Sequence, residues 1–202
     1  MITQLRIAML ILQTCTTTLI AHELVNITAI NPHIQLDIRY ATTNNFTKKK
    51  IYSGGYCFLQ KPVARALNNV QKELELLGLG LTIFDGYRPL SVQKIFWDLV
   101  PDERYVANPT KGSRHNRGCA VDVTLIKADG SAVLMPTEFD DFTTKAHRDY
   151  RQLPPEAIAN RDLLTTIMTK HGFIGLPTEW WHFDYKTWEE YPILDISFEE
   201  LI

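Results

Sequence analysis

The stretch Ser113-Arg114-His115-Asn116-Arg117-Gly118-Cys119-Ala120-Val121-Asp122 begins with polar residues and ends with small and β-branched ones. Over residues 119–126 an apolar set alternates with a set that contains one carboxylate, which is the period-2 pattern of a β-strand. Asp122 therefore shares a face with Ala120, where a buried carboxylate needs a cation or several hydrogen-bond donors. His115 lies in the preceding loop and can fold back over that face. The pair could ligate a divalent metal ion; a hydrogen-bonded core aspartate beside an unrelated histidine is the simpler alternative.

Composition favours one globular domain. The chain has 202 residues, of which 45% are apolar, and a formal net charge of -2. This length suits a single domain with a sizeable core. The basic residues are scattered apart from Lys48-Lys49-Lys50, so no basic stripe for nucleic acid is present and no nucleic-acid partner is expected. We expect one catalytic domain over residues 22–202, of unspecified oligomeric state.

The N-terminus differs from the rest of the chain. Arg6 precedes the apolar run 7–12, and a small residue follows at Ala21, an arrangement typical of a secretory signal peptide. We therefore expect residues 1–21 to be removed and the protein to be periplasmic or secreted. A buried N-terminal helix in a cytoplasmic protein is the alternative. The run is shorter than the roughly 20 residues of a transmembrane helix, so no stable membrane span is expected.

Two cysteines remain once that segment is removed, Cys57 and Cys119. An even pair in an exported protein suggests a disulfide between them. In a cytoplasmic protein both would be free buried thiols.

Strand and helix patterns alternate along the chain. Helical spacing of apolar residues predicts helices over 62–77 and 91–100 and from Pro155 to the residues before Gly172, whereas alternation predicts strands over 34–40, 81–85, 119–126 and 179–185. Asp129-Gly130 predicts a hairpin turn that leads into a strand over 132–135. Helices and hairpin strands in one domain indicate an α+β fold.

A catalytic zinc ion usually has three protein ligands and keeps its fourth position open for water. Of the six histidines, His182 is the best third ligand beside His115 and Asp122, because it is central in an aromatic strand and has an acid three residues earlier. His147 is the second choice. The earlier acid, Glu179, is then the natural general base. In an ideal strand the side chains of Glu179 and His182 point to opposite faces, so we expect Glu179 on a turn or bulge where the strand begins.

Arg88 follows a strand end within Asp85-Gly86-Tyr87-Arg88-Pro89. A fixed guanidinium there could stabilise the oxyanion of a tetrahedral intermediate, an effect worth about 3 kcal/mol per donor. Asp85 could hold it in place. A salt bridge within the turn is the alternative.

These motifs together are more specific than any one of them. Ser113-x-His115-x-x-Gly118-x-Ala120-x-Asp122, with Glu179-x-x-His182, resembles the zinc signature of D-alanyl-D-alanine metallopeptidases. The dipeptidase (VanX-type) branch is indicated by further segments: Tyr40-Ala41-Thr42-x-x-Asn45-Phe46-Thr47, Asp85-Gly86-Tyr87-Arg88-Pro89, Phe139-Asp140 and Glu179-Trp180-Trp181-His182. The resemblance runs in collinear order from Asn31 to Tyr185. It implies a central antiparallel sheet with flanking helices, a fold shared with the hedgehog signalling domain.

Carried over residue by residue, the resemblance implies roles for nine side chains. One zinc ion would be bound by His115, Asp122 and His182. Glu179 would be the base and Arg88 would stabilise the intermediate. Asp140 would hold the substrate's free ammonium, although Asp141 is adjacent, and the remaining substrate contacts would be Ser113, Tyr40 and less securely Tyr52.

The implied activity is zinc-dependent hydrolysis of the dipeptide D-Ala-D-Ala to two D-alanines in cell-wall peptide turnover. One alternative is a D,D- or L,D-carboxypeptidase that acts on longer peptidoglycan peptides. Another is a zinc-bearing binding domain without catalysis, against which the presence of both Glu179 and Arg88 argues.

Overall fold

The computed structural model describes residues 23–202, so the predicted signal segment, residues 1–21, lies outside the described residues. Within that range the main sheet has five strands, in the order β2 (Gln35–Leu36), β4 (Leu79–Asp85), β5 (Ala120–Lys127), β7 (His182–Tyr185) and β6 (Phe173–Gly175). A separate two-stranded ribbon pairs β1 (Leu24–Asn26) with β3 (Phe58–Gln60). The predicted α+β class is confirmed. The sheet is mixed rather than wholly antiparallel, because β2 runs parallel to β4.

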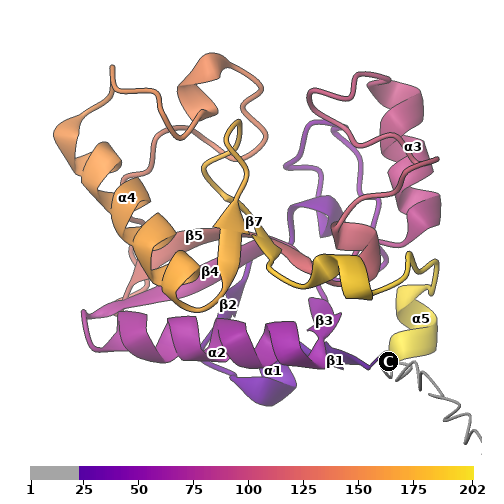
Figure 1. Cartoon of the computed structure of the whole chain (residues 1–202), viewed down its shortest axis with the longest axis horizontal. Coiled ribbons are helices and arrows are strands. Elements are labelled where there is room, and N and C mark those ends of the chain that lie inside the picture. Colours follow the sequence, from indigo (N-terminus) through magenta and orange to yellow (C-terminus); the bar gives the residue numbers. More distant parts are fainter. Residues whose placement is uncertain (1–22) are drawn as a thin grey trace, which may run out of the picture.

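Two long helices cover the sheet (Figure 1). α2 (Lys61–Glu75) has Pro62 in its first turn and packs its apolar stripe against β4, while α4 (Pro155–Lys170) packs against β6 and α2. α3 (Leu90–Leu99) lies on the opposite side of the molecule from α4. Short helices are α1 (Ile27–Ile30) and α5 (Phe198–Leu201), and short 3-10 turns span Arg39–Ala41, His115–Arg117, Thr144–Ala146 and Trp188–Glu190. No helix among residues 23–202 is long and apolar enough to cross a bilayer.

The core supports the central strand β5. Val121, Val123 and Leu125 are buried in the hydrophobic core and alternate with a set that includes Asp122, which lines the site. β4 pairs with almost the whole of β5, and a bulge between Ile83 and Asp85 brings Asp85 opposite Asp122. The period-2 pattern around Asp122 therefore corresponds to a strand with one apolar face and one functional face.

Two predicted strands are shorter than expected, and a third does not form. The strand predicted over 34–40 ends at Leu36, and Tyr40 lies in a 3-10 turn that buries its ring. The predicted strand over 132–135 is wrong: only one bridge, Ile126 to Ala132, forms. Pro136 follows directly and has no N–H to extend a ladder. The last strand begins at His182 instead of residue 179, because the residues before it form a loop.

The predicted disulfide is not present in the structure. Cys57 and Cys119 are both free, buried thiols. The Sγ atom of Cys119 lies 3.4 Å from the carbonyl oxygen of Arg117. Burial raises the pKa of both thiols, that of Cys119 to about 12, so the reactive thiolate is disfavoured at each position.

Candidate functional site

Strand register brings two of the three predicted metal ligands together. Asp122 on β5 is the direct antiparallel partner of His182 on β7, and such partners point to the same face of a sheet. His115 reaches that face from the 3-10 turn His115–Arg117. Gly118 ends this turn at φ +66°, and a Cβ at that position would lie 2.5 Å from Cδ2 of Leu24. The glycine therefore permits both the reversal of the chain and its close contact with β1.

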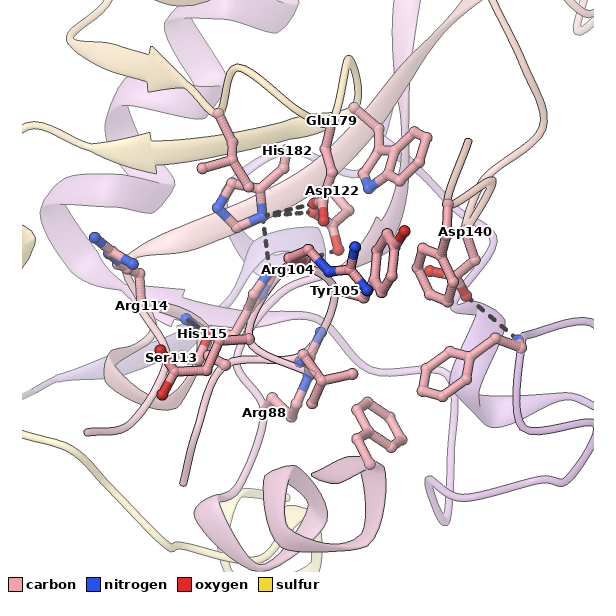
Figure 2. A pocket seen from close by; sticks show the side chains of 18 of the residues that line it. Arg88, Arg104, Tyr105, Ser113, Arg114, His115, Asp122, Asp140, Glu179 and His182 are labelled. Atoms are coloured by element: carbon pink, nitrogen blue, oxygen red, sulfur yellow. Dashed lines mark hydrogen bonds and ion pairs between the residues drawn. The ribbon is translucent and has the colours of Figure 1, made fainter. Parts of the chain in front are cut away.

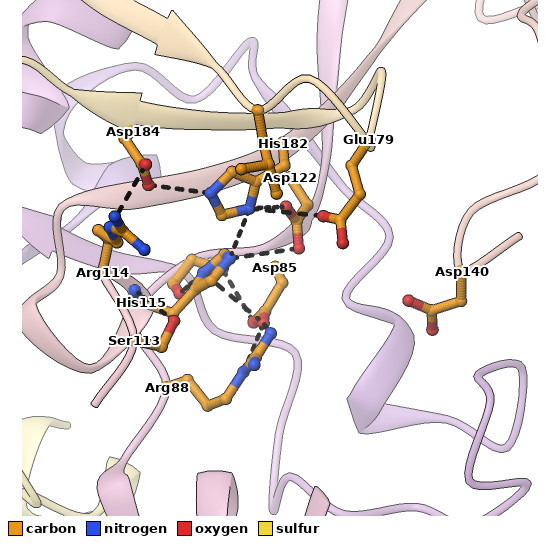
Figure 3. Close-up of polar contacts among 12 residues, drawn as sticks. Asp85, Arg88, Ser113, Arg114, His115, Asp122, Asp140, Glu179, His182 and Asp184 are labelled. Carbon is orange, nitrogen blue, oxygen red and sulfur yellow. Dashed lines mark hydrogen bonds and ion pairs between the residues drawn. The ribbon is translucent and has the colours of Figure 1, made fainter. Parts of the chain in front are cut away.

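The three side chains are buried and their polar atoms converge (Figure 3). Nε2 of His115 lies 3.2 Å from Nδ1 of His182 and 3.5 Å from Oδ2 of Asp122. Nδ1 of His182 lies 3.0 Å from Oδ1 of Asp122. Ligands of tetrahedral zinc, at about 2.0–2.2 Å from the ion, lie about 3.3–3.6 Å from one another. The distances of 3.0–3.5 Å between these side chains are close to that spacing, so the three side chains can hold one zinc ion.

The outward-facing nitrogen of each histidine determines which atom is free to bind the metal. Nδ1 of His115 lies 2.7 Å from the carbonyl oxygen of Gly86, and Nε2 of His182 lies 2.9 Å from Oδ1 of Asp184. A carbonyl or carboxylate oxygen only accepts, so these two nitrogens carry the protons. The lone pairs of His115 Nε2 and His182 Nδ1 are then directed at the centre, as ligation requires. The donor set and its hydrogen bonds identify a zinc site.

Asp184 was not among the predicted site residues, although it lies two residues after His182 on the same face of β7. Replacing Asp184 by asparagine should weaken zinc binding by about 10- to 100-fold, because the amide is a weaker acceptor and sets the His182 tautomer less firmly. Competition with a chromogenic chelator measures this. An affinity equal to that of the unchanged chain would show that Asp184 does not orient the ligand.

Glu179 lies in the loop before β7, as the strand geometry predicted. Its Oε2 is 3.9 Å from Nδ1 of His182, and its side chain is 17% exposed. The carboxylate thus faces the metal centre from outside the set of three ligands. Burial raises the pKa of Glu179. That shift brings the carboxyl group closer to the protonation equilibrium needed of a residue that both accepts and donates a proton.

Arg148 holds the loop that carries Glu179. Its Nε and Nη2 donate to the carbonyl oxygens of Leu176 and His182, each at 2.8 Å. Its guanidinium stacks over Phe183 at 4.2 Å. A Cβ at Gly175 would lie 2.4 Å from Cζ of Arg148, so a side chain at that position would displace this guanidinium. No pattern in the sequence indicated this role for Arg148.

Arg88 is fixed at the base of the pocket. Its Nε and Nη2 donate to Oδ2 of Asp85 at 3.1 and 2.7 Å, and its Nη1 donates to Oε1 of Gln93 at 2.8 Å. The guanidinium also stacks over Phe96 at 4.8 Å. These bonds use three of the five N–H groups, so two remain for a substrate oxygen. Arg88 therefore forms the salt bridge within the turn and also keeps two N–H donors for a substrate, so the two interpretations of the sequence both hold.

The site opens into a small pocket with a volume of about 170 Å³ (Figure 2). Of the residues predicted from the resemblance, the pocket is lined by Tyr40, Arg88, Ser113, His115, Asp122, Asp140, Glu179 and His182. Tyr52 does not line it; its hydroxyl donates to Oδ1 of Asp85 at 2.8 Å. His147 lies in a neighbouring cleft and is not part of the group of metal ligands.

Asp140 and its neighbour Asp141 are distinguished by the structure. Asp140 has φ +60° and its carboxylate accepts from the Tyr40 hydroxyl at 3.2 Å and from the Phe46 backbone N–H at 3.4 Å. Asp141 instead accepts from the Thr143 backbone N–H at 2.8 Å and does not line the pocket. Loss of hydration and the nearby negative charge of Asp122 raise the pKa of Asp140 to about 7.

Further residues that support or line the pocket were not among the predicted site residues. Asn116 is fully buried and ties two loops together, since its Nδ2 donates to the carbonyl oxygen of Arg88 at 2.8 Å. Arg104, Tyr105 and Phe142 form part of the wall, and the rings of Tyr105 and Phe142 are 4.8 Å apart. Arg114, which precedes the ligand His115 in the sequence, also lines the pocket.

The chain is similar in sequence to known proteins along most of its length. A family model described as D-ala-D-ala dipeptidase matches residues 20–195, which include every site residue above. The D-alanyl-D-alanine dipeptidase of Escherichia coli is 39% identical over 176 residues, covering 87% of this chain and 91% of the relative. That of Enterococcus faecalis is 35% identical over 181 residues, covering 79% and 89%. A solved structure described as VanYB in complex with D-Alanine-D-Alanine aligns over 68% of this chain and 76% of that one, at 18% identity and a TM-score of 0.45.

Proposed function

The chain belongs to the D-alanyl-D-alanine dipeptidase family, and from this premise we propose that it hydrolyses D-Ala-D-Ala to two molecules of D-alanine. The family resemblance of the sequence motifs is thereby confirmed. One observation carries the proposal for this chain: the zinc ligands, Glu179, Arg88 and Asp140 all line the same small pocket. The D configuration of the substrate follows from the family and from no single residue.

The chemistry divides among the residues that line the pocket. Zinc bound by His115, Asp122 and His182 would polarise the scissile carbonyl and lower the pKa of a water molecule. Glu179 accepts the proton of the attacking water and returns it to the nitrogen of the leaving D-alanine. Arg88 directs its two remaining N–H groups at the oxygen on which negative charge develops.

Substrate length is set by the pocket and by Asp140. A volume of about 170 Å³ is below the roughly 300–1,000 Å³ of pockets for drug-sized ligands, which favours a dipeptide over a longer chain. The Asp140 carboxylate would pair with the free ammonium of the substrate. An acylated amino end has no charge to offer and would leave this carboxylate unpaired in a poorly hydrated site.

The proposal is tested by measuring amine release from D-Ala-D-Ala and from N-acetyl-D-Ala-D-Ala, with zinc and after chelation. We expect cleavage of the free dipeptide alone and loss of that cleavage on chelation. Cleavage of the acetylated peptide as well would indicate a carboxypeptidase that acts on longer peptides. No cleavage of either by the zinc-loaded protein would contradict the proposal and favour a binding domain.

Recognition of the ammonium should depend on pH. Because the pKa of Asp140 is raised to about 7, its ionised form is lost as the pH falls through that value. We therefore expect KM for D-Ala-D-Ala to rise below about pH 7. Asp140→Asn should raise KM by about 10- to 100-fold, as for loss of a charge-assisted hydrogen bond, and should flatten this dependence. Asp141→Asn is the matched control. An unchanged profile in Asp140→Asn would assign the dependence to another group.

We also propose that the protein is exported, because of the composition of its first 21 residues. The test is mass spectrometry of the intact N-terminus after expression in a bacterial host. A mature chain that begins near His22 is the expected result. A chain that still begins at Met1 in the cytoplasmic fraction would contradict export.

A further inference from the structure

A dipeptide carries a carboxylate as well as an ammonium, and the roles assigned above leave the carboxylate without a cationic partner. Among the residues that the structure describes, three arginines and no lysine line the pocket: Arg88, Arg104 and Arg114. Arg88 is committed to Asp85, to Gln93 and to the developing oxyanion. Arg104 is bound by Asp102 through both Nε and Nη2, and its side chain is 76% exposed. Arg114 is therefore the cation that remains.

The guanidinium of Arg114 has N–H groups that are available to bind a ligand. Within residues 23–202 no hydrogen bond uses its guanidinium, and its buried Nε has no hydrogen-bond partner. Its single ion pair, from Nε to Oδ2 of Asp184, is long at 3.5 Å. The guanidinium is instead held by packing, 4.5 Å over the ring of Trp188. Its side chain is 43% exposed, so the two Nη groups are left for a ligand.

The position of Arg114 suits the carboxylate end of a dipeptide. Figures 2 and 3 show Arg114 and Asp140 on opposite sides of the cluster formed by His115, Asp122 and His182. A substrate whose ammonium lies at Asp140 and whose scissile carbonyl lies at the metal must direct its carboxylate toward the other side. The planar fork of an arginine matches a carboxylate with two parallel N–H···O bonds.

We propose that Arg114 is a specificity-determining residue that binds the α-carboxylate of the substrate. This inference rests on the proposed function. The negative charge of Asp184 weakens the attraction between Arg114 and a substrate carboxylate only in part. Its Oδ1 is bound by His182, and its Oδ2 makes the single long contact with Arg114. Arg114 and Asp140 would together select a zwitterion of dipeptide length, one charge at each end.

The test compares D-Ala-D-Ala with its C-terminal amide in the zinc-loaded full chain and in Arg114→Gln. The unchanged chain should prefer the acid. Arg114→Gln should lower kcat/KM for the acid by about 10- to 100-fold, mainly through KM, and leave kcat/KM for the amide unchanged. Arg117→Gln is the matched control, because Arg117 also stacks on Trp188, at 5.4 Å, but does not line the active-site pocket.

Zinc content is measured in each variant because Arg114 pairs with Asp184 beside a ligand. An equal fall in kcat/KM for the acid and for the amide would overturn the inference and make Arg114 a residue that positions Asp184. Retained preference for the acid in Arg114→Gln, with the unchanged chain active, would also overturn it and leave the proposed function intact. If the unchanged chain cleaves neither compound, the proposed function fails and this inference fails with it.

Discussion

Replacing Glu179 by glutamine should lower kcat for D-Ala-D-Ala by about 10²- to 10⁴-fold while zinc stays bound, because the amide cannot accept a proton from the attacking water. The side chain lies outside the set of ligands, with its Oε2 3.9 Å from Nδ1 of His182, so its loss removes no metal bond. Glutamine keeps the size and the polarity of the side chain. The measurement is steady-state amine release alongside zinc content by atomic emission.

The control for Glu179→Gln is Glu138→Gln, which changes an exposed carboxylate outside the pocket. It should retain full activity. If Glu179→Gln kept its kcat with zinc bound, another group would have to carry the proton. Loss of zinc from Glu179→Gln would instead show that the residue supports the metal and would leave its catalytic role without support.

Replacing Arg88 by alanine should damage both catalysis and stability. Loss of the oxyanion donor should lower kcat by about 10²- to 10³-fold. The free energy of unfolding should fall by about 3–5 kcal/mol, because Asp85 would remain as a buried charge without its partner. Asp85 is 0% exposed, and its ion pair with Arg88 measures 2.7 Å. Urea denaturation and steady-state kinetics, both with zinc present, measure the two effects.

A double variant separates those two effects. Arg88→Met with Asp85→Asn removes both charges and keeps similar volumes, so most of the lost free energy of unfolding should return. The amide oxygen that Asp85→Asn introduces could still accept from the Tyr52 hydroxyl, which in the unchanged chain donates to Oδ1 of Asp85 at 2.8 Å. Activity should not recover. Recovery of activity together with stability would mean that Arg88 acts only through the fold.

Local sequence patterns were sufficient to predict the helix and strand that support the site. The predicted helix over 62–77 and the strand over 119–126 correspond to α2 and β5 within two residues at each end, because burial of one face leaves a periodic record in the sequence. The sequence pattern predicted the strands at the edges of the sheet less well. β2 has only two residues, and residues 132–135 form a single bridge, because neighbouring strands decide whether such segments pair.

The sequence alone determined the zinc ligands, the position of Glu179 before a strand, and the family. These features depend on residue types at fixed spacings, which can be recognised in the sequence without the structure. Other features were decided only by the tertiary structure: the register that places Asp122 opposite His182, the Asp184 hydrogen bond, and the anchoring of the Glu179 loop by Arg148. The unoccupied hydrogen-bonding groups of Arg114 belong with them. Each depends on contacts between residues far apart in the chain, and such contacts leave no periodic or spaced pattern to read.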